Sequence, residues 1–389
     1  MSQTKARLSS FLMRRAVGNR HGLVLRPQQA PLSQSDVASI IHFGVPRSLS
    51  QPWSSAAGGV GRDRETSELA AIGEAIERAA SAQVKLDLKP RSDLEQAQRV
   101  DAEEFALFTP KQRSQDGFVH TKIYDQKCPY VEVFSLQDNS SRWAPQPFVS
   151  LQDDFATGIP TSSGLAAAPT AQKALLRGIQ ELIERDALMV TWLHGLPGRR
   201  VKSLAGHIDE IEQLNGDMVT FDLTPKYSPF PVAAVMGGIK KQGKWRYSLG
   251  VACRETWAEA AEKAYLEWNQ GVIFYSLYPE HWHELPIWGD ETIHKVKNYA
   301  SFKSDSQALA AAKKALKNAN IRLYYRDITT IDALQAGERV VKALSPDMAM
   351  IFAHQEWPFL AKVESMAASH YPDLASRSTF PNLMPHPLG

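Results

Sequence analysis

The sequence predicts an α+β fold in which mixed sheets carry packed helices. Apolar residues recur at helical spacing in several long segments, and shorter apolar runs bounded by turn residues predict strands. The two kinds of segment are intermixed, without the strict alternation of strand and helix that marks a doubly wound parallel sheet. The chain of 389 residues is long enough for one large domain, and no change of composition divides its main part.

The first part of the chain is expected to pass from an irregular arm into a long helix. Residues 1–50 are interpreted as an N-terminal arm and loop region, because prolines interrupt them and a Gly-rich stretch at 54–61 follows. The basic N-terminus is interpreted as frayed, with an arm that contacts a partner as the alternative. Residues 66–84 are predicted to be helical, with Ile72 and Ile76 on one face.

The remaining elements follow from the same kinds of signal. Thr170 is expected to cap a helix that runs to about Leu193. Thr256 and Glu259 have the spacing of a capping box and predict a third helix that ends near Tyr275. The other predicted elements are a hairpin of 229–240 with 244–253, a helix at 305–318, a strand at 321–329, and strands near Val340 and at 348–353. Residues 51–389 are interpreted as one main domain that ends in a proline-rich tail.

The composition excludes several classes of protein. The 44 basic and 42 acidic residues nearly cancel, whereas a nucleic-acid-binding domain is usually strongly basic. The two cysteines, Cys128 and Cys253, are too few for a disulfide framework or a four-cysteine zinc site, and they fit a reducing, cytoplasmic environment. No apolar run is long enough to predict a transmembrane helix. We therefore expect a cytoplasmic enzyme that contacts neither nucleic acid nor membrane.

The most informative feature is a repeated motif. Glu74-Ala-Ile-Glu-Arg-Ala-Ala80 and Glu181-Leu-Ile-Glu-Arg-Asp-Ala187 share five of seven residues and lie on two different predicted helices. Glutamates three apart project from one helix face, and the arginine four residues after the first glutamate lies there too. Four converging carboxylates would repel one another unless a cation such as Mg²⁺, which prefers oxygen ligands, lay between them. The alternative is two ordinary ion pairs on solvent-facing helices.

Two loops and a third helix add weaker signals. Residues 54–61 and 161–168 are built largely from Gly, Ala, Ser and Thr, which allow backbone N–H groups to approach a phosphate. Neither loop contains the Gly-Lys-Ser/Thr of a P-loop. Lys263, Glu267 and Gln270 share one helix face, which offers a cation for phosphate and a further carboxylate for metal. Ordinary loops and a solvated helix face are the alternatives.

Two histidine-containing segments were also considered. His281-Trp-His283-Glu284 could bind a metal, although a polar loop is the simpler interpretation, and His386 in the tail is interpreted as exposed rather than catalytic. No nucleophile elbow, zinc-protease motif or dinucleotide fingerprint occurs.

The order of these motifs resembles the YcaO family. A Gly-rich loop precedes the first Glu-x-x-Glu-Arg, Thr161-Ser-Ser-Gly-Leu-Ala-Ala167 precedes the second, and a Lys-x-x-x-Glu helix follows. Arg339-Val-Val-Lys-Ala-Leu-Ser-Pro-Asp347 and the Pro-His-Pro tail extend the likeness to about residues 50–389. The resemblance implies a YcaO-like ATP-binding fold for the main domain, with ATP and Mg²⁺ as cofactors.

The resemblance also implies roles for individual residues. Glutamates of both motifs would hold Mg²⁺ against the ATP phosphates: Glu74, Glu77, Glu181 and Glu184. Further polar and charged side chains would line the nucleotide site: Arg78, Ser162, Ser163, Arg185, Lys263 and Glu267. The carboxylate of Gly389, at the end of the tail, is our candidate for the general base that a nucleophilic side chain needs.

The activity implied is that of an azoline-forming cyclodehydratase. Such an enzyme phosphorylates backbone amide oxygens of a ribosomal precursor peptide and forms thiazoline or oxazoline rings from Cys, Ser or Thr. The expected partners are the precursor peptide, a separate ThiF-like leader-binding protein and an FMN-dependent azoline dehydrogenase. Thioamide or amidine formation is the alternative reaction. A degenerate scaffold subunit stays open, because the sequence departs from the family pattern at positions such as Val60 and Lys263.

Overall fold

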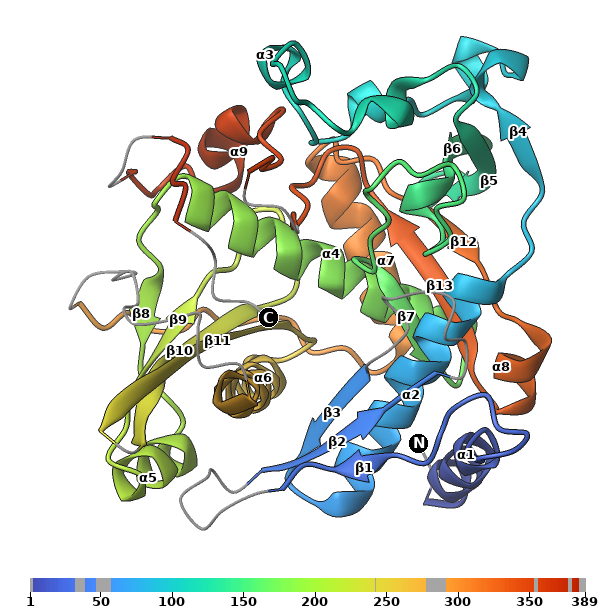
Figure 1. The fold of residues 1–389 in the computed structure, drawn as a ribbon. Helices are drawn as coiled ribbons and strands as arrows, with labels where there is room; N and C mark the ends of the chain where they lie inside the picture. The colour runs from blue at the N-terminus through green and yellow to red at the C-terminus, as the bar shows by residue number, and fades with distance from the viewer. Residues whose placement is uncertain are drawn as a thin grey trace.

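The computed structural model describes residues 3–31, 39–46, 57–241, 243–277, 292–352, 356–376 and 380–384. Antiparallel sheets carry helices packed on their faces, so the α+β prediction is confirmed. Figure 1 shows the helix α4 (Ala171–Leu193) crossing the centre of the molecule, with sheets on either side of it. None of the described helices is long and apolar enough to cross a bilayer.

The largest sheet has six strands; five follow the order β4-β5-β12-β13-β7, and β6 pairs with β5 outside this path, along residues 130–134. All of its strand pairs are antiparallel. Its strands are β4 (Leu88–Pro90), β5 (Pro129–Ser135), β6 (Ser141–Pro145), β7 (Leu165–Ala168), β12 (Tyr324–Asp327) and β13 (Arg339–Leu344).

Two smaller antiparallel sheets complete the β structure. The four-stranded sheet has the order β11-β10-β9-β8 and contains the predicted hairpin. Its strands are β8 (Arg199–Val201), β9 (Asp217–Asp222), β10 (Val232–Lys241) and β11 (Lys244–Cys253). The three-stranded sheet has the order β1-β2-β3, with strands β1 (Gln28–Gln29), β2 (Ile40–Gly44) and β3 (Ala57–Gly61).

Three long helices lie where the sequence predicts them: α2 (Arg64–Gln83), α4 and α6 (Trp257–Leu277). The Asp63 side chain caps α2 by accepting from the Thr66 N–H at 2.8 Å, so this helix begins earlier than predicted. Thr170 caps α4 as predicted, accepting from the Lys173 N–H at 3.2 Å. Such caps satisfy N–H groups that have no partner within the helix.

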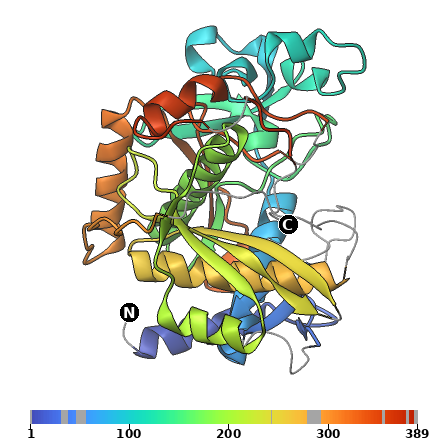
Figure 2. The ribbon, with the colours of Figure 1, turned by 90° about the vertical axis from the view of Figure 1, so that its left-hand side faces the viewer.

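The long helices are fixed by the sheets that they cover. Helix α2 packs on β2 and β3, and α6 packs on β10 and β11. Figure 2 shows α6 running under the long strands of the four-stranded sheet. Helix α4 packs against β7 and β13 on one side and β11 on the other, so it touches both larger sheets. Apolar side chains of α2 and α4, such as Ile76 and Ile183, belong to one continuous core.

Shorter elements surround this framework. The other helices are α1 (Gln3–Arg15), α3 (Pro110–Arg113), α5 (Ala205–Gln213), α7 (Asp305–Asn318), α8 (Ile331–Gln335) and α9 (Val363–His370). Single 3₁₀ turns occupy Arg91–Asp93, Gln96–Gln98, Ala102–Glu104, Thr121–Tyr124 and Gln146–Phe148. Cys128 and Cys253 are both buried and unpaired, as expected from the absence of a disulfide framework.

The expectation of an irregular N-terminal arm is wrong. Residues 1–50 include helix α1 and strands β1 and β2, and α1 packs on α2 with Met13 against the core. Strand β2 pairs with β3, which lies in the stretch that was predicted to be a Gly-rich loop. Glycines suit this strand because a Cβ at Gly59 would collide with the backbone of α2. The division into an arm and a main domain stays a prediction.

The predicted strand at 348–353 is also wrong for its described part. Residues 348–352 form only an isolated bridge between Ala349 and Ala106, and residue 353 lies outside the described part of the chain. The Ala349 N–H donates to the buried Asp186 carboxylate at 2.7 Å. A side chain therefore satisfies a backbone group that a sheet would otherwise have to pair.

Candidate functional site

The first copy of the repeated motif lies on α2 and faces two strands. Glu74 accepts a hydrogen bond from the Gly58 N–H of β3 at 2.9 Å and pairs with Arg78 at 3.1 Å. Glu77 accepts from the Ala167 N–H of β7 at 3.2 Å. Both carboxylates therefore lie on the face of α2 that meets strand backbone, not on a solvent-facing surface. This arrangement contradicts the interpretation of the motif as an ordinary surface ion pair.

The second copy lies on α4 and is more deeply placed. The Glu184 side chain is 5% exposed and accepts from the Cys253 N–H at the end of β11, at 3.2 Å. Arg185 lies 3.5 Å from a Glu181 oxygen and 3.6 Å from a Glu184 oxygen, so it contacts both glutamates of its motif. Helical spacing predicts the contact with Glu181, four residues earlier, whereas the contact with the adjacent Glu184 is not predicted by it.

The two motifs are coupled electrostatically. Burial raises the pKa of the Glu77 carboxyl well above its ordinary value, and the charges of Glu181 and Glu74 raise it further, against the opposing effect of Arg78. Burial also raises the pKa of Glu184 to about 8, with Glu267 and Glu181 adding to the shift and Arg185 opposing it. The charge of Glu181 therefore raises the pKa of a glutamate in each of the two motifs. The carboxylates form one connected set across α2, α4 and α6.

The predicted face of α6 joins this set. Lys263 pairs with Glu267 at 3.1 Å, one helical turn apart. The Gln270 amide lies directly over Gly58, where a Cβ would collide with it. Gly58 in turn donates its N–H to Glu74. Helix α6 therefore adjoins the motif on α2, because Gln270 contacts Gly58, and it influences the motif on α4, because the charge of Glu267 raises the pKa of Glu184.

The predicted loop at 161–168 is a turn followed by strand β7. The Ser163 N–H donates to the Thr161 hydroxyl at 3.1 Å, and the Leu165 N–H donates to the Ser162 carbonyl at 2.8 Å. Gly164 has a φ of +80°, a left-handed conformation that favours glycine. Ser163 is buried and Ser162 is partly exposed. Thr161 and Ser163 share a small cavity with Arg185, so the turn adjoins the motif on α4.

Two charged residues near the glutamates were not identified as site residues from the sequence. Lys342 of β13 donates from Nζ to the carbonyls of Thr161 and Ser163, at 2.5 and 2.7 Å. Burial lowers its pKa to about 7, opposed by the charges of Glu181 and Glu77. Arg254, which follows β11, opposes the rise in the pKa of Glu184. A single lysine inside the apolar run around Val341 was the available signal for Lys342.

These carboxylates fit a hard divalent cation. Within the described residues, no group of three or more His, Cys, Asp or Glu side chains is arranged so that it could hold a metal ion. Mg²⁺ usually takes only one or two protein carboxylates and completes its shell with water and phosphate oxygens. Arg78 Nε is buried and has no hydrogen-bond partner within the described part of the chain. The set therefore combines acceptors for a cation with an unused donor for an anion.

Several predicted residues lie outside the described part of the chain. They are residues 54–56 of the Gly-rich stretch, the segment 281–284, His386 and Gly389. The tail before Gly389 is described from 380 to 384, and it lies against the C-terminal end of α4. Trp192 Nε1 donates to the Met384 carbonyl at 2.8 Å, and the Asn382 N–H donates to the Leu193 carbonyl at 2.7 Å.

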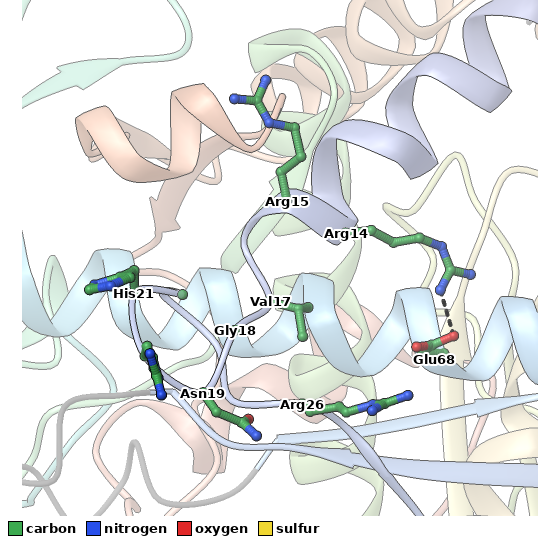
Figure 3. Close-up of a pocket in the computed structure, with 10 residues that line it drawn as sticks. Arg14, Arg15, Val17, Gly18, Asn19, His21, Arg26 and Glu68 are labelled. Carbon is green, nitrogen blue, oxygen red and sulfur yellow. Dashed lines mark hydrogen bonds and ion pairs between the residues drawn. The ribbon is translucent and has the colours of Figure 1, made fainter.

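A larger cavity of about 650 Å³ lies elsewhere, at the junction of α1 and α2 (Figure 3). Its lining includes four arginines: Arg14, Arg15, Arg20 and Arg26. Arg14 is turned to Glu68 of α2, with 2.7 Å between donor and acceptor. Glu68 is the one acidic residue that lines this cavity. The cavity therefore lacks the several carboxylates that the candidate site contains.

Comparisons with known proteins identify the family and the fold of the chain. The sequence pattern of a family described as YcaO cyclodehydratase, ATP- and Mg²⁺-binding, matches residues 58–349, about three quarters of the chain. No curated protein sequence matches.

Three solved structures illustrate the structural likeness. A heterocyclase in complex with substrate and cofactor has a TM-score of 0.72 and 18% identity, covering 88% of this chain and 52% of its own. The YcaO protein of Methanopyrus kandleri, bound with AMPPCP and Mg²⁺, has a TM-score of 0.62 and 13% identity, covering 90% and 91%. A chain of the E. coli microcin synthetase McbBCD complex with pro-MccB17 bound has a TM-score of 0.63 and 17% identity, covering 92% of this chain and 96% of its own.

At these identities the likeness shows the fold. The YcaO-like fold that the sequence predicts is therefore confirmed. The chain spans about half the length of the heterocyclase.

Proposed function

Because the chain belongs to the YcaO family, we propose that it is an ATP-dependent cyclodehydratase of a ribosomal precursor peptide. It phosphorylates backbone amide oxygens and forms thiazoline or oxazoline rings from Cys, Ser or Thr. The observation that carries the proposal is the connected set of carboxylates on α2, α4 and α6. In the proposal, Glu74, Glu77, Glu181 and Glu184 hold Mg²⁺.

The nucleotide occupies the space beside these glutamates in this proposal. Arg78 and Arg185 neutralise phosphate charge and orient the glutamates that they pair with. Ser162 and Ser163 offer their hydroxyl groups from the turn before β7, and Ser162 also offers its N–H, since the Ser163 N–H donates to the Thr161 hydroxyl. Lys263 and Glu267 extend the site from α6, where their ion pair is partly exposed.

Magnesium-bound ATP supplies a phosphoryl group that turns an amide oxygen into a leaving group. The peptide's side-chain sulfur or oxygen adds to the preceding carbonyl carbon, and the carbonyl oxygen takes the γ-phosphoryl group as ADP is released. Loss of phosphate and of the amide proton leaves a C=N bond in the ring, a net loss of one water. The chain's residues contribute by positioning and by neutralising charge, which account for most catalysis of phosphoryl transfer.

We propose the Gly389 carboxylate as the general base. The anchored tail supports this proposal, because Met384 is held beside Trp192. Trp192 and Glu184 are separated by about 12 Å along α4, at 1.5 Å per residue. The segment 385–389 spans up to about 17 Å when extended, which suffices to reach the glutamates.

Appending a few residues after Gly389 tests this role, because it displaces the charge without removing the anchor at Trp192. The extended protein should still bind Mg²⁺ and nucleotide but form rings more slowly, by about a factor of 10² to 10⁴. A normal rate, measured as the loss of one water mass per ring, would transfer the role of base to another group.

We further propose that a separate protein supplies leader recognition. The E. coli microcin synthetase, one chain of which this chain resembles in fold, was solved as a complex with pro-MccB17 bound. In our proposal the partner is a ThiF-like leader-binding protein, and an FMN-dependent dehydrogenase oxidises azolines to azoles. Pull-down of a ThiF-like protein encoded nearby, with and without precursor peptide, tests the first of these partners.

The rival functions are separated by product and by turnover. Incubation with ATP, Mg²⁺, the partner and a precursor peptide encoded beside this protein should release phosphate and reduce the peptide mass by one water per ring. A mass gain equal to replacement of oxygen by sulfur would indicate thioamide formation. Binding of peptide and nucleotide without phosphate release would indicate a scaffold subunit.

A further inference from the structure

Lys342 is a charged residue in the interior of the largest sheet. It is 1% exposed, and its neighbours Val340 and Ala343 on β13 are fully buried. Burial of an ammonium group is costly unless hydrogen bonds compensate for the lost water. Lys342 obtains such bonds from two carbonyls, those of Thr161 and Ser163. The only hydrogen bonds of its side chain to described residues therefore tie β13 to one turn.

That turn is fixed to β13 on both sides of the lysine. In the sheet register Lys342 lies opposite Leu165, the first residue of β7. The Ala343 N–H donates to the Gly164 carbonyl at 2.8 Å, and a Cβ at Gly164 would collide with the Ala343 carbonyl. The turn at 161–164 is thus held by three carbonyl contacts to two consecutive residues of β13.

The direction of these carbonyls fixes the direction of two N–H groups. In a trans peptide the carbonyl and the following N–H point in opposite directions. Because the Thr161 and Ser163 carbonyls point to Lys342, the N–H groups of Ser162 and Gly164 point away from it. Neither N–H donates to another described residue. Unpaired N–H groups in a turn form a concave site for anions such as phosphate.

The lysine lies on the strand next to one that contacts a motif glutamate: Glu77 accepts from the Ala167 N–H of β7 at 3.2 Å, and β7 pairs with β13, with Leu165 opposite Lys342. The charges of Glu181 on α4 and Glu77 on α2 stabilise its protonated form, whereas that of Arg78 opposes it. Lys342 therefore places positive charge beside one glutamate from each motif. In this position its positive charge reduces the repulsion between the two glutamates. The same charge would repel a metal ion bound to these carboxylates and so weaken the binding of that ion.

We propose that Lys342 is a positioning residue that holds the turn at 161–164 in its phosphate-binding shape and acts as an internal counter-charge to Glu77 and Glu181. This inference rests on the proposed function, since it assigns Mg²⁺ to the glutamates and phosphate to the turn. It separates two effects of one side chain. Removal of the ammonium group should weaken phosphate binding through the turn and strengthen the binding of Mg²⁺ alone through the carboxylates.

The test compares Lys342→Met and Lys342→Gln with the intact protein. For Lys342→Met, calorimetry should show the affinity for Mg²⁺·AMPPCP falling about tenfold, while the affinity for Mg²⁺ alone rises a few-fold, as expected when a nearby cation is removed. Hydrogen exchange of the amides at 162–165 should become faster. Lys342→Gln keeps one donor, so its nucleotide affinity should lie between those of the other two proteins.

Lys173→Met is the matched control, because Lys173 is also a lysine bonded to protein oxygens, those of Glu255 and Asp305, outside the carboxylate set. It should change neither affinity. A parallel loss of Mg²⁺ and Mg²⁺·AMPPCP binding in both Lys342 variants would reduce the lysine to a structural role and overturn the inference. If the intact protein bound neither ligand, the proposed function would fail. Unchanged exchange at 162–165 in both Lys342 variants would then refute the hold on the turn as well.

Discussion

The two copies of the repeated motif use the same contacts at different depths. In each copy the second glutamate accepts an N–H from a strand, Ala167 for Glu77 and Cys253 for Glu184, at 3.2 Å in both cases. On α2, Arg78 pairs with Glu74 alone among the described acidic residues, and both side chains are partly exposed. On α4 the arginine reaches both glutamates of its motif, and one of them is almost fully buried.

The residue after the arginine also differs between the two copies. On α2 it is Ala79, a small core residue. On α4 it is Asp186, which is fully buried, accepts from the Ala349 N–H and the Tyr227 hydroxyl at 2.7 Å, and lies 3.1 Å from His370. One turn of α4 thus carries both candidate ligands and an anchor for the C-terminal part of the chain. The comparison teaches that a repeated motif can preserve the face of a site while its neighbours differ.

The largest expected effect comes from removing one carboxylate charge from either helix. Glu77→Gln and Glu184→Gln should each reduce ATP consumption by about a hundredfold or more, because loss of a metal ligand costs several kcal/mol of transition-state stabilisation. Phosphate release at limiting Mg²⁺ measures this effect. Glu68→Gln, on the same helix as Glu77 but paired with Arg14, should keep normal turnover. Normal turnover in either variant would show that the glutamate changed in that variant is not a Mg²⁺ ligand, so the two helices would not contribute equally to the site.

The second expected effect distinguishes α4 from α2. Asp186→Asn should lower the free energy of unfolding by about 3 kcal/mol, because it removes the charge that compensates buried His370. Urea denaturation of the ligand-free protein measures the loss. The control Asp332→Asn changes an exposed aspartate on α8 and should remain within about 0.5 kcal/mol of the intact protein. An unchanged stability of Asp186→Asn would show that α4 has no anchor beyond its packing.

The smallest expected effect concerns pH and the ligand-free protein. The pKa of Glu184 is raised to about 8 in the folded state, so the folded protein binds this proton more tightly than the unfolded chain does. The corresponding stability is fully present below the ordinary pKa of 4.5 and is lost as pH rises toward 8. Glu184→Gln lacks this loss and should be more stable than the intact protein at pH 8.

Thermal midpoints between pH 5 and pH 8 measure the effect of Glu184. Glu95 is exposed and has no hydrogen bond through its side chain to described residues, so Glu95→Gln should follow the curve of the intact protein. A lower midpoint for Glu184→Gln at pH 8 would favour the ion-pair interpretation of its motif.

The elements that the sequence predicted well are those specified by local signals. Helical periodicity and the cap at Thr170 located α4, and the apolar runs around the turn at Gly243 located the hairpin of β10 and β11. The repeated motif identified glutamates that the fold brings into one connected set, because helical spacing alone fixes their common face. Family membership was also predictable, since the order of motifs is a property of the chain itself.

The elements that the sequence missed depend on distant contacts. Helix α1 is stabilised by packing on α2, and residues around Ala349 are satisfied by Asp186 rather than by a neighbouring strand. Lys342 became a candidate only when β13 was found beside the turn at 161–164. No local pattern reports which carbonyls a buried lysine meets, so these features had to come from the structure.

The central claim is that α2 and α4 form one site for Mg²⁺ and nucleotide. Calorimetric titration with AMPPCP tests it most directly, with and without Mg²⁺, on the intact protein, Glu77→Gln and Glu184→Gln. The account predicts Mg²⁺-dependent binding to the intact protein and a loss of affinity on the order of a hundredfold in both variants, one from each helix. Binding of AMPPCP that needs no divalent ion, or that survives unchanged in either variant, would contradict it.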